Sequence, residues 1–300
     1  ETLYADGALP PSSGHDSVFC SEWVDWMPIS ADTLQKAVVR EVCVSGADTD
    51  SSDKDKSSAA ALPLRGLKIV LNPGNGAGGF FQKVLENLGA DCTSSIHLEP
   101  DGTFPNGVPN PEDERMILET LQTCEQAQAD LGIMLDTDAD RCGFVVPRTV
   151  VQDETTGAIT KRSDYEPLGR NRLIALLGVV FSRSDPGSAV VTDSVTSEGL
   201  TTFLEDKLGL THVRYLKGYA NVINKAKELT ESGELNAALA IETSGHCAMK
   251  ENDYLDDGTY TAVKVVSLLA RERAAGTTSL LDLIQDMPEM AEICELRCPT

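Results

Sequence analysis

Short apolar runs alternate with amphipathic segments along the chain from residue 67 onward. Apolar runs of this length are typical of strands buried in a sheet, whereas the segments between them repeat their apolar positions with the period of a helix. We expect strands at 68–71, 93–98, 131–135, 143–146, 189–192, 212–216 and 237–241. We expect helices at 33–44, 80–88, 111–127, 171–181, 198–208, 221–229, 260–273 and 280–287.

This order predicts an α/β fold with two successive three-layer α/β/α domains, whose sheets are mixed and mostly parallel. We place the two domains at residues 64–165 and 166–291. Residues 45–63 form a polar, low-complexity run and are expected to be a flexible linker. Residues 1–44 would then be the remnant of an earlier domain, and residues 292–300 the start of a link to a later one.

Composition narrows the range of partners. The chain has 300 residues with 41% hydrophobic residues, enough for two cores, and a formal net charge of -22. That charge argues against a broad grip on nucleic acid or an anionic membrane, so small molecules are the expected partners. The eight cysteines form no Cys-x-x-Cys pair, which indicates reduced thiols in an intracellular protein. We expect a cytoplasmic or plastid protein that is not secreted.

Three aspartates, Asp136, Asp138 and Asp140, follow the apolar run 131–135 at alternate positions. Ligand sites of parallel sheets lie at the carboxyl ends of strands, and clustered carboxylates need a cation to neutralise them. The all-oxygen set predicts a Mg²⁺ site. A calcium loop would need Gly and Glu where Arg141 and Pro147 stand. The nucleophile loop of dehalogenase-type phosphatases would have Thr or Val in place of Asp140.

A glycine-rich turn at 74–79 satisfies the G-x-G-x-x-G pattern between a strand and a helix, with Glu99 twenty residues beyond it. Dinucleotide binding is therefore a rival interpretation. The same glycines also permit close packing of a strand-to-helix turn, and nucleotide binding would leave the three aspartates unexplained.

The strand at 237–241 ends in Glu242, Ser244 and His246. Glu and Ser spaced by two could hydrogen-bond adjacent hydroxyls of a sugar. His246 could equally be a structural hydrogen-bond partner. Lys217 and Gly218 follow another strand, where the lysine could approach a phosphate or simply be solvated. Asp256 and Asp257 are expected to cap the helix at 260–273, and Ser279 the helix at 280–287.

Taken together, the sequence Asp136-Thr137-Asp138-Ala139-Asp140-Arg141 and the sequence Glu242-Thr243-Ser244-Gly245-His246 resemble the two central loops of the α-D-phosphohexomutases. The glycine-rich turn 71–78 resembles the opening of that family's second domain. The family has four domains around one cleft, with a phosphoserine in the first, a Mg²⁺ loop in the second, a sugar loop in the third and a phosphate loop in the fourth.

The resemblance implies an isomerase that moves a phosphoryl group between the C1 and C6 hydroxyls of a hexose phosphate. Asp136, Asp138 and Asp140 would hold one Mg²⁺, and Arg141 would lie beside the transferred phosphoryl group. Glu242, Ser244, His246, Lys217 and Gly218 would bind the substrate. A hexose 1,6-bisphosphate would be the intermediate.

Two family motifs do not occur in these 300 residues: the Thr-x-Ser-His-x-Pro loop with the nucleophilic serine, and the Arg-x-Ser-Gly-Thr phosphate loop. We therefore expect this chain to be an incomplete fragment that is inactive alone. Two other hypotheses stay open. One is a metal-dependent phosphatase with Asp136 as nucleophile, and the other is a non-catalytic protein that binds sugar phosphates.

Overall fold

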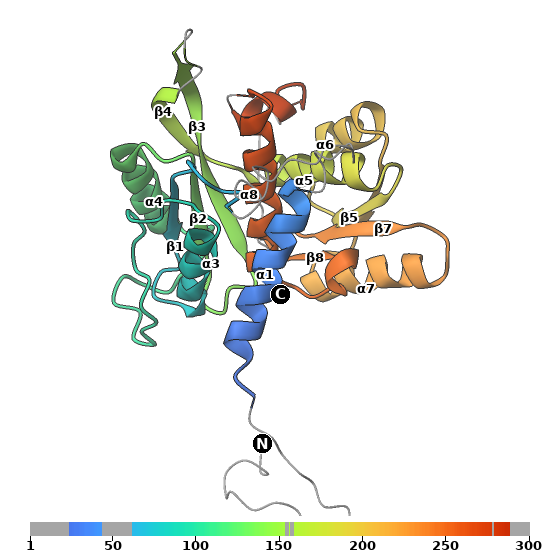
Figure 1. The fold of residues 1–300 in the computed structure, drawn as a ribbon. Coiled ribbons are helices and arrows are strands. Elements are labelled where there is room, and N and C mark those ends of the chain that lie inside the picture. The colour runs from blue at the N-terminus through green and yellow to red at the C-terminus, as the bar shows by residue number, and fades with distance from the viewer. Residues whose placement is uncertain (1–23, 44–61, 154–155, 157–158, 278, 289–300) are drawn as a thin grey trace, which may run out of the picture.

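The computed structural model describes residues 24–43, 62–153, 156, 159–277 and 279–288, which form two four-stranded sheets with helices packed on them (Figure 1). Both sheets are mixed and flanked by helices, which confirms the predicted α/β class. Among the described helices, none has the length and apolar character needed to cross a membrane.

The first sheet has the strand order β1-β2-β3-β4. Its strands are β1 (Ile69–Asn72), β2 (Leu131–Leu135), β3 (Cys142–Gln152) and β4 (Ile159–Pro167). The pair β1 and β2 runs parallel, with Ile69 opposite Leu131, while the β2–β3 and β3–β4 pairs are antiparallel. Parallel pairing is therefore less common in this sheet than the sequence led us to expect.

The second sheet has the order β6-β5-β7-β8. Its strands are β5 (Ala189–Asp193), β6 (Thr211–Tyr215), β7 (Ala237–Ile241) and the unpredicted β8 (Cys247–Met249). Strand β5 pairs in parallel with both β6 and β7, and β8 is antiparallel to β7. Because three neighbouring strands run in the same direction, the turns that follow them lie at one edge of the sheet.

Helices cover both sheets. They are α1 (Trp26–Cys43), α3 (Phe81–Asn87), α4 (Glu114–Ala127), α5 (Arg170–Ser184), α6 (Glu198–Thr202), α7 (Tyr219–Glu231) and α8 (Gly258–Ala274). Shorter helical turns are η2 (Ala77–Phe80), η3 (Phe203–Lys207), η4 (Lys250–Asn252) and η5 (Leu280–Ile284). Helix α4 packs on the first sheet and α7 on the second, while α8 contacts α1, α5 and strands of both sheets.

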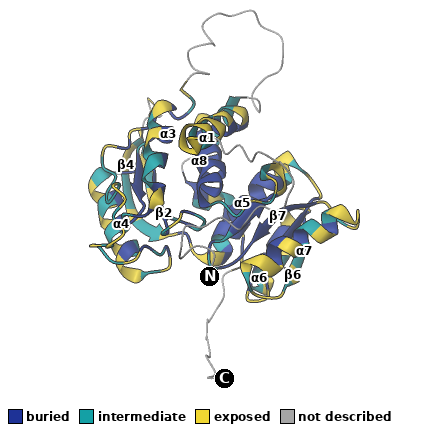
Figure 2. Cartoon of the chain, turned by 90° about the horizontal axis from the view of Figure 1, so that it is seen from below, coloured by how far each residue is buried: buried dark blue, intermediate teal, exposed yellow. Residues whose placement is uncertain are grey.

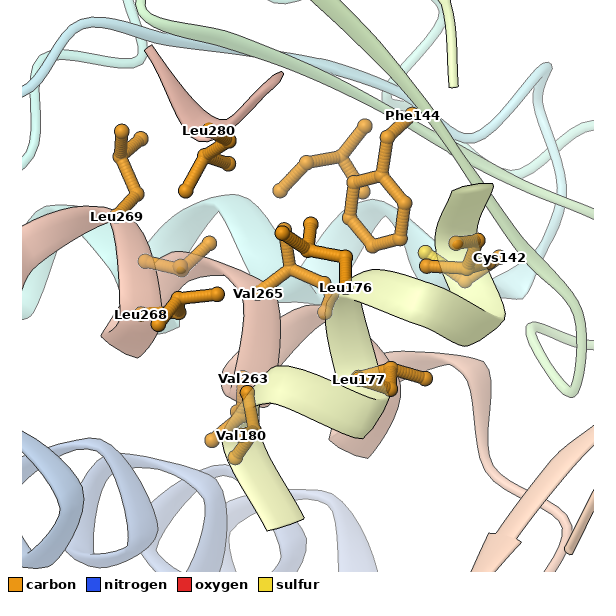
Figure 3. Close-up of a cluster of buried hydrophobic side chains, with 14 of the residues drawn as sticks. Cys142, Phe144, Leu176, Leu177, Val180, Val263, Val265, Leu268, Leu269 and Leu280 are labelled. Carbon is orange, nitrogen blue, oxygen red and sulfur yellow. The ribbon is translucent and has the colours of Figure 1, made fainter. Parts of the chain in front are cut away.

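The two sheets share one hydrophobic core. Figure 3 shows side chains of β3, such as Phe144, beside Leu176 of α5 and Val265 of α8. Buried residues are concentrated in the sheets and in these two central helices (Figure 2). Helix α8 follows the second sheet in sequence but also packs on β2 and β3, so the two units are joined through their interiors.

Several predicted helix boundaries were wrong. Helix α1 begins at Trp26 instead of residue 33, and Pro28 is accommodated because the first turn needs no N–H partner there. Helix α4 begins at Glu114, since Asp113 and not Asn110 caps it by accepting from two backbone N–H groups. The helix predicted at 198–208 divides into α6 and the π-helical turn η3, and that predicted at 280–287 is the shorter 3₁₀ turn η5.

Two strand predictions also differ from the structure. No strand forms at 93–98. This segment lies beside β1, but only the N–H of Ile96 donates to a backbone carbonyl of that strand, and Ser95 Oγ accepts from the N–H of Leu71 in place of a backbone carbonyl. The strand predicted at 143–146 continues to Gln152 as β3, and it forms a long hairpin with β4. Most of the predicted linker at 45–63, and the predicted link at 292–300, lie outside the described residues.

Candidate active site

Strand β2 leads into the turn that carries the three aspartates. Asp136 is buried, and its two carboxylate oxygens accept from the backbone N–H of Arg141 (3.1 Å) and from Arg141 Nε (2.7 Å). Ala139 has a left-handed backbone (φ 65°), which reverses the chain between Asp138 and Asp140. Asp136 therefore closes the turn, and Asp138 is its exposed member. We call residues 136–141 the metal loop.

The glycine-rich turn after β1 supports the metal loop on one side. A Cβ at Gly76 would lie 2.8 Å from the carbonyl oxygens of both Asp136 and Thr137. The N–H of Ala77 donates to the carbonyl of Thr137 (2.9 Å). The close approach explains why glycine is needed at this position, without a dinucleotide.

Helix α8 supports the metal loop on the other side. The N–H of Gly258, its first residue, donates to the carbonyl of Ala139 (3.0 Å). A Cβ at Gly258 would lie 2.8 Å from that oxygen. The metal loop of the first unit is thus held in part by a helix of the second.

The three aspartates suit a divalent cation. Each offers an oxygen within 4.8 Å of the others. Asp140 Oδ1 is buried and accepts no hydrogen bond from the described residues. Burial, and after it the charge of Asp136, raises the pKa of Asp140 to about 6. An all-oxygen set with a buried oxygen left without a hydrogen bond fits Mg²⁺.

A second group that could hold a metal shares Asp140 and adds His246 and Asp256. His246 Nδ1 lies 2.7 Å from Asp256 Oδ2, so these two side chains already satisfy each other. Mg²⁺ prefers oxygen ligands to imidazole nitrogen. The aspartate triad is therefore the better candidate of the two.

Residues 242–246, which we call the sugar loop, form a tight turn between β7 and β8. Glu242 is 6% exposed, and its two oxygens accept from the backbone N–H of Gly218 (2.8 Å) and from Ser244 Oγ (2.7 Å). Gly218 has a φ of 118°, a backbone conformation that favours glycine. Glu242 thereby connects the sugar loop to the turn after β6.

The metal loop and the sugar loop meet at Arg141 and His246, which pair as an antiparallel β-bridge. His246 Nδ1 lies 3.7 Å from Asp140 Oδ2, and its ring stacks on Tyr219 with centroids 4.6 Å apart. Burial opposes the ring's positive charge, but the hydrogen bond and the charge of Asp256 outweigh it, so the pKa of His246 is raised. His246 is the point where three loops converge.

Almost all of the predicted site residues come together in this way. Lys217 is the exception: its side chain is exposed and makes no hydrogen bond or ion pair with the described residues. The carbonyl of Lys217 accepts from Asn221 Nδ2 (2.8 Å). Its proximity to a phosphate stays a prediction.

Sequence reasoning missed several polar residues of the site. Asp193, at the end of β5, accepts from both the N–H and the hydroxyl of Thr243. Asp256 contacts His246 instead of capping α8, which Asp257 does. Asn110 Oδ1 lies 3.4 Å from Arg141 Nη1. For Asp193 a signal existed, since a carboxylate that ends an apolar strand is the same pattern that identified Asp136.

A cavity of about 210 Å³ lies beside the sugar loop. Its lining includes Phe144 of β3 and Ser244 of the sugar loop. Glu112 and Arg170, which also line it, form an ion pair of 2.6 Å. The sugar loop therefore borders a space between the two units.

Two protein-family models match this chain. The model of the phosphoglucomutase/phosphomannomutase alpha/beta/alpha domain II matches residues 50–149, and that of domain III matches residues 170–290. Together they cover well over half of the chain. The chain belongs to the phosphoglucomutase/phosphomannomutase family.

Members of this family with curated names are similar to the chain. The phosphomannomutase/phosphoglucomutase of Pseudomonas syringae pv. tomato is 31% identical over 212 residues, which are 70% of this chain and 40% of that protein. The chain thus spans less than half of that relative's length.

Solved structures of the superfamily share the fold. A phosphoglucomutase/phosphomannomutase family protein from Burkholderia thailandensis has a TM-score of 0.63 and 23% identity, over 86% of this chain and 46% of that one. The N-acetylphosphoglucosamine mutase of Aspergillus fumigatus, in complex with GlcNAc-6P and magnesium, has a TM-score of 0.50 and 15% identity, over 86% and 58%.

Proposed function

We propose that this chain forms the Mg²⁺-binding and sugar-binding half of a phosphohexomutase. The observation that carries the proposal is the junction of the metal loop with the sugar loop, about a hundred residues apart in sequence, through Arg141 and His246. The family match and the magnesium in the structure of the Aspergillus relative support it. The domains would be residues 64–165, with the metal loop, and 166–291, with the sugar loop.

In the proposed reaction, a phosphoserine that these 300 residues do not contain transfers its phosphoryl group to the free hydroxyl of a hexose phosphate. The resulting hexose 1,6-bisphosphate reorients, and its other phosphoryl group returns to the serine. Such transfers depend on positioning and on stabilising charge at the moving phosphoryl group.

Each predicted residue has a role in this scheme. Asp136, Asp138 and Asp140 would hold one Mg²⁺, which when bound offsets negative charge on the phosphoryl oxygens. The guanidinium of Arg141, held by Asp136 through Nε, would contact the phosphoryl group with its remaining N–H groups. Glu242 would accept from a sugar hydroxyl.

The other predicted substrate residues would act beside these. Ser244 and His246 would complete the contacts to the sugar, and Gly218 would keep its loop close to Glu242 through the hydrogen bond of 2.8 Å. Lys217, with no partner for its ammonium among the described residues, would bind the substrate's distal phosphate.

A phosphatase that uses Asp136 as nucleophile fits this geometry less well. Both oxygens of Asp136 accept from Arg141, and the residue is 1% exposed. An attacking carboxylate must admit a whole phosphoryl group at one of these oxygens, whereas a metal ion needs only the lone pair that remains on it.

The test is Mg²⁺-dependent binding of glucose 1-phosphate and mannose 1-phosphate to this chain by calorimetry. We expect Glu242→Gln to weaken binding by about tenfold, the loss of one charge-assisted hydrogen bond. Glu234→Gln, an exposed acid on the same unit, is the control and should bind as the unchanged chain does. Isomerisation of the same sugars by the whole protein tests the activity, and its failure with every hexose phosphate would reject a mutase.

A further inference from the structure

Two carboxylates connect the turns that follow three neighbouring strands of the second sheet. Glu242 joins the turn after β7 to the turn after β6 through the N–H of Gly218. Asp193 joins the turn after β7 to its own turn after β5. Glu242 is a predicted substrate residue, whereas Asp193 has no part in the proposed reaction.

The contacts of Asp193 are specific. Its Oδ2 accepts from the N–H of Thr243 (2.9 Å) and from the Thr243 hydroxyl (2.6 Å), and its Oδ1 accepts from the N–H of Val195 (3.1 Å). Asp193 is completely buried, and Thr243 is 7% exposed. The carboxylate therefore holds the main chain of the sugar loop at its centre.

This arrangement is not what stability alone would favour. Among the described residues, no lysine or arginine forms an ion pair with Asp193, and its carboxylate oxygens accept three hydrogen bonds from neutral donors. A buried carboxylate without a cationic partner is costly, and an apolar pair in its place would often be at least as stable. Its effect is to fix the direction of the loop that follows β7.

The position of Thr243 explains what is fixed. It stands between Glu242 and Ser244, the two residues proposed to bind the sugar, which hydrogen-bond to each other at 2.7 Å. The hydroxyl of Thr243 is turned to Asp193 and is held there. Holding this middle residue fixes the direction in which both neighbours leave the backbone.

We propose that Asp193 is a positioning residue of the sugar site. Its contact with the N–H and hydroxyl of Thr243, which we call the latch, orients the sugar loop, and Thr243 itself does not distinguish one sugar from another. This inference rests on the proposed function for the identity of the ligand. It assigns sugar preference to groups other than Thr243, although Thr243 lies between Glu242 and Ser244 in the sugar loop. Loosening the latch should weaken binding of different hexose phosphates by the same factor.

The test compares Thr243→Val, Thr243→Ser and Asp193→Asn in the full 300-residue chain. Valine keeps the shape and the backbone N–H but loses the hydroxyl, whereas serine keeps the hydroxyl. Calorimetry with Mg²⁺ gives the dissociation constants for glucose 1-phosphate and mannose 1-phosphate. Hydrogen exchange gives the protection of the amides at 242–246, and thermal unfolding shows that each variant is folded.

We expect Thr243→Val to weaken binding of both sugars by about tenfold, the usual effect of losing one buried charge-assisted hydrogen bond. Thr243→Ser keeps that bond and should weaken binding by less than about twofold. Asp193→Asn should weaken both by at least as much as valine and speed exchange at the Thr243 amide. Mg²⁺ affinity should stay unchanged in all three variants, because neither the side chain of Asp193 nor that of Thr243 forms a hydrogen bond with the metal loop.

Two results would overturn the latch. One is a folded Thr243→Val chain that binds both sugars as the unchanged chain does. The other is a changed ratio between the two dissociation constants, which would show that Thr243 helps to distinguish glucose 1-phosphate from mannose 1-phosphate. If the unchanged chain binds neither sugar, the proposed function fails, and the exchange rates of the Asp193→Asn loop alone decide whether the latch exists.

Discussion

At the scale of single residues, His212 shows how a partly buried ring responds to pH. Its Nε2 lies 2.8 Å from the hydroxyl of Thr192 and its Nδ1 2.9 Å from that of Thr201. Burial, followed by the charge of Arg214, lowers the pKa of His212 to about 4. At a pH between these two pKa values, about 4 when folded and 6.5 when unfolded, the ring is neutral in the folded chain and protonated in the unfolded chain.

Between the unfolded pKa of about 6.5 and the folded pKa of about 4, the unfolded state binds more protons, so stability falls as pH falls. From pH 6.5 to pH 5 we expect this ring to cost about 1 kcal/mol, allowing for its partial exposure. Denaturant unfolding at both pH values, compared with His212→Gln, measures it. An equal loss in the variant would rule out His212 as the source.

A second residue-scale feature is the contact of Gly76 with the metal loop. Gly76→Ala would place a methyl group 2.8 Å from two carbonyl oxygens. We expect the loop to shift, at a cost of about 1 to 3 kcal/mol in stability and about tenfold in Mg²⁺ affinity. Gly102→Ala is the matched control, because a Cβ there meets open space. Unchanged Mg²⁺ affinity in Gly76→Ala would show that the glycine-rich turn does not set the loop.

At the scale of elements, α1 and α8 are joined by a buried ion pair. Lys264 of α8 is fully buried, with its Nζ 2.7 Å from Glu41 of α1 and 2.6 Å from Glu251. Tyr260 donates to Glu251 and accepts from Arg40 of α1. Helix α1 is therefore attached by charge as well as by its apolar side chains.

Removing the cation from this cluster should be costly. Lys264→Met leaves the buried Glu41 without its closest cation, since Arg40 and Arg271 each lie 3.8 Å from it, and we expect the free energy of unfolding to fall by about 3 kcal/mol. Adding Glu41→Gln should recover part of that loss. Lys36→Met, at an exposed ion pair of α1, is the control and should change stability by less than about 1 kcal/mol. An unchanged free energy of unfolding in Lys264→Met would contradict the stabilising role of this ion pair.

Elements with a strong local pattern could be predicted from the sequence, and others could not. Strands β2 and β7 were predicted with the limits that they have in the structure, because each is a continuous apolar run ended by a carboxylate. Strand β8 was missed because its three residues are too few to show a period. The expected strand at 93–98 failed because Ser95 replaces a backbone partner of β1, which no periodicity reveals.

The candidate site shows the same division. The aspartates and the sugar loop could be recognised from their own residues. The contacts of Asp193 with Thr243 and of Asp256 with His246 join positions 50 and 10 residues apart and depend on how the strands pair. Such partners become visible only once the topology is known.

At the scale of the whole molecule, α8 makes the two sheets interdependent. It begins at the metal loop, packs on β2 and β3, and ends where Arg273 pairs with the buried Asp130 (2.6 Å). We therefore expect calorimetry to show a single unfolding transition for both units. Two well-separated transitions would mean that the sheets unfold as independent domains.

We propose that the metal loop and the sugar loop form one site for a hexose phosphate. An NMR titration of this chain with glucose 1-phosphate in the presence of Mg²⁺ tests it most directly. We expect the backbone amide signals of 136–141 and of 242–246 to shift together with one dissociation constant, and Glu242→Gln to weaken both responses alike. Shifts in one loop only, or shifts that are unaffected by Glu242→Gln, would contradict it.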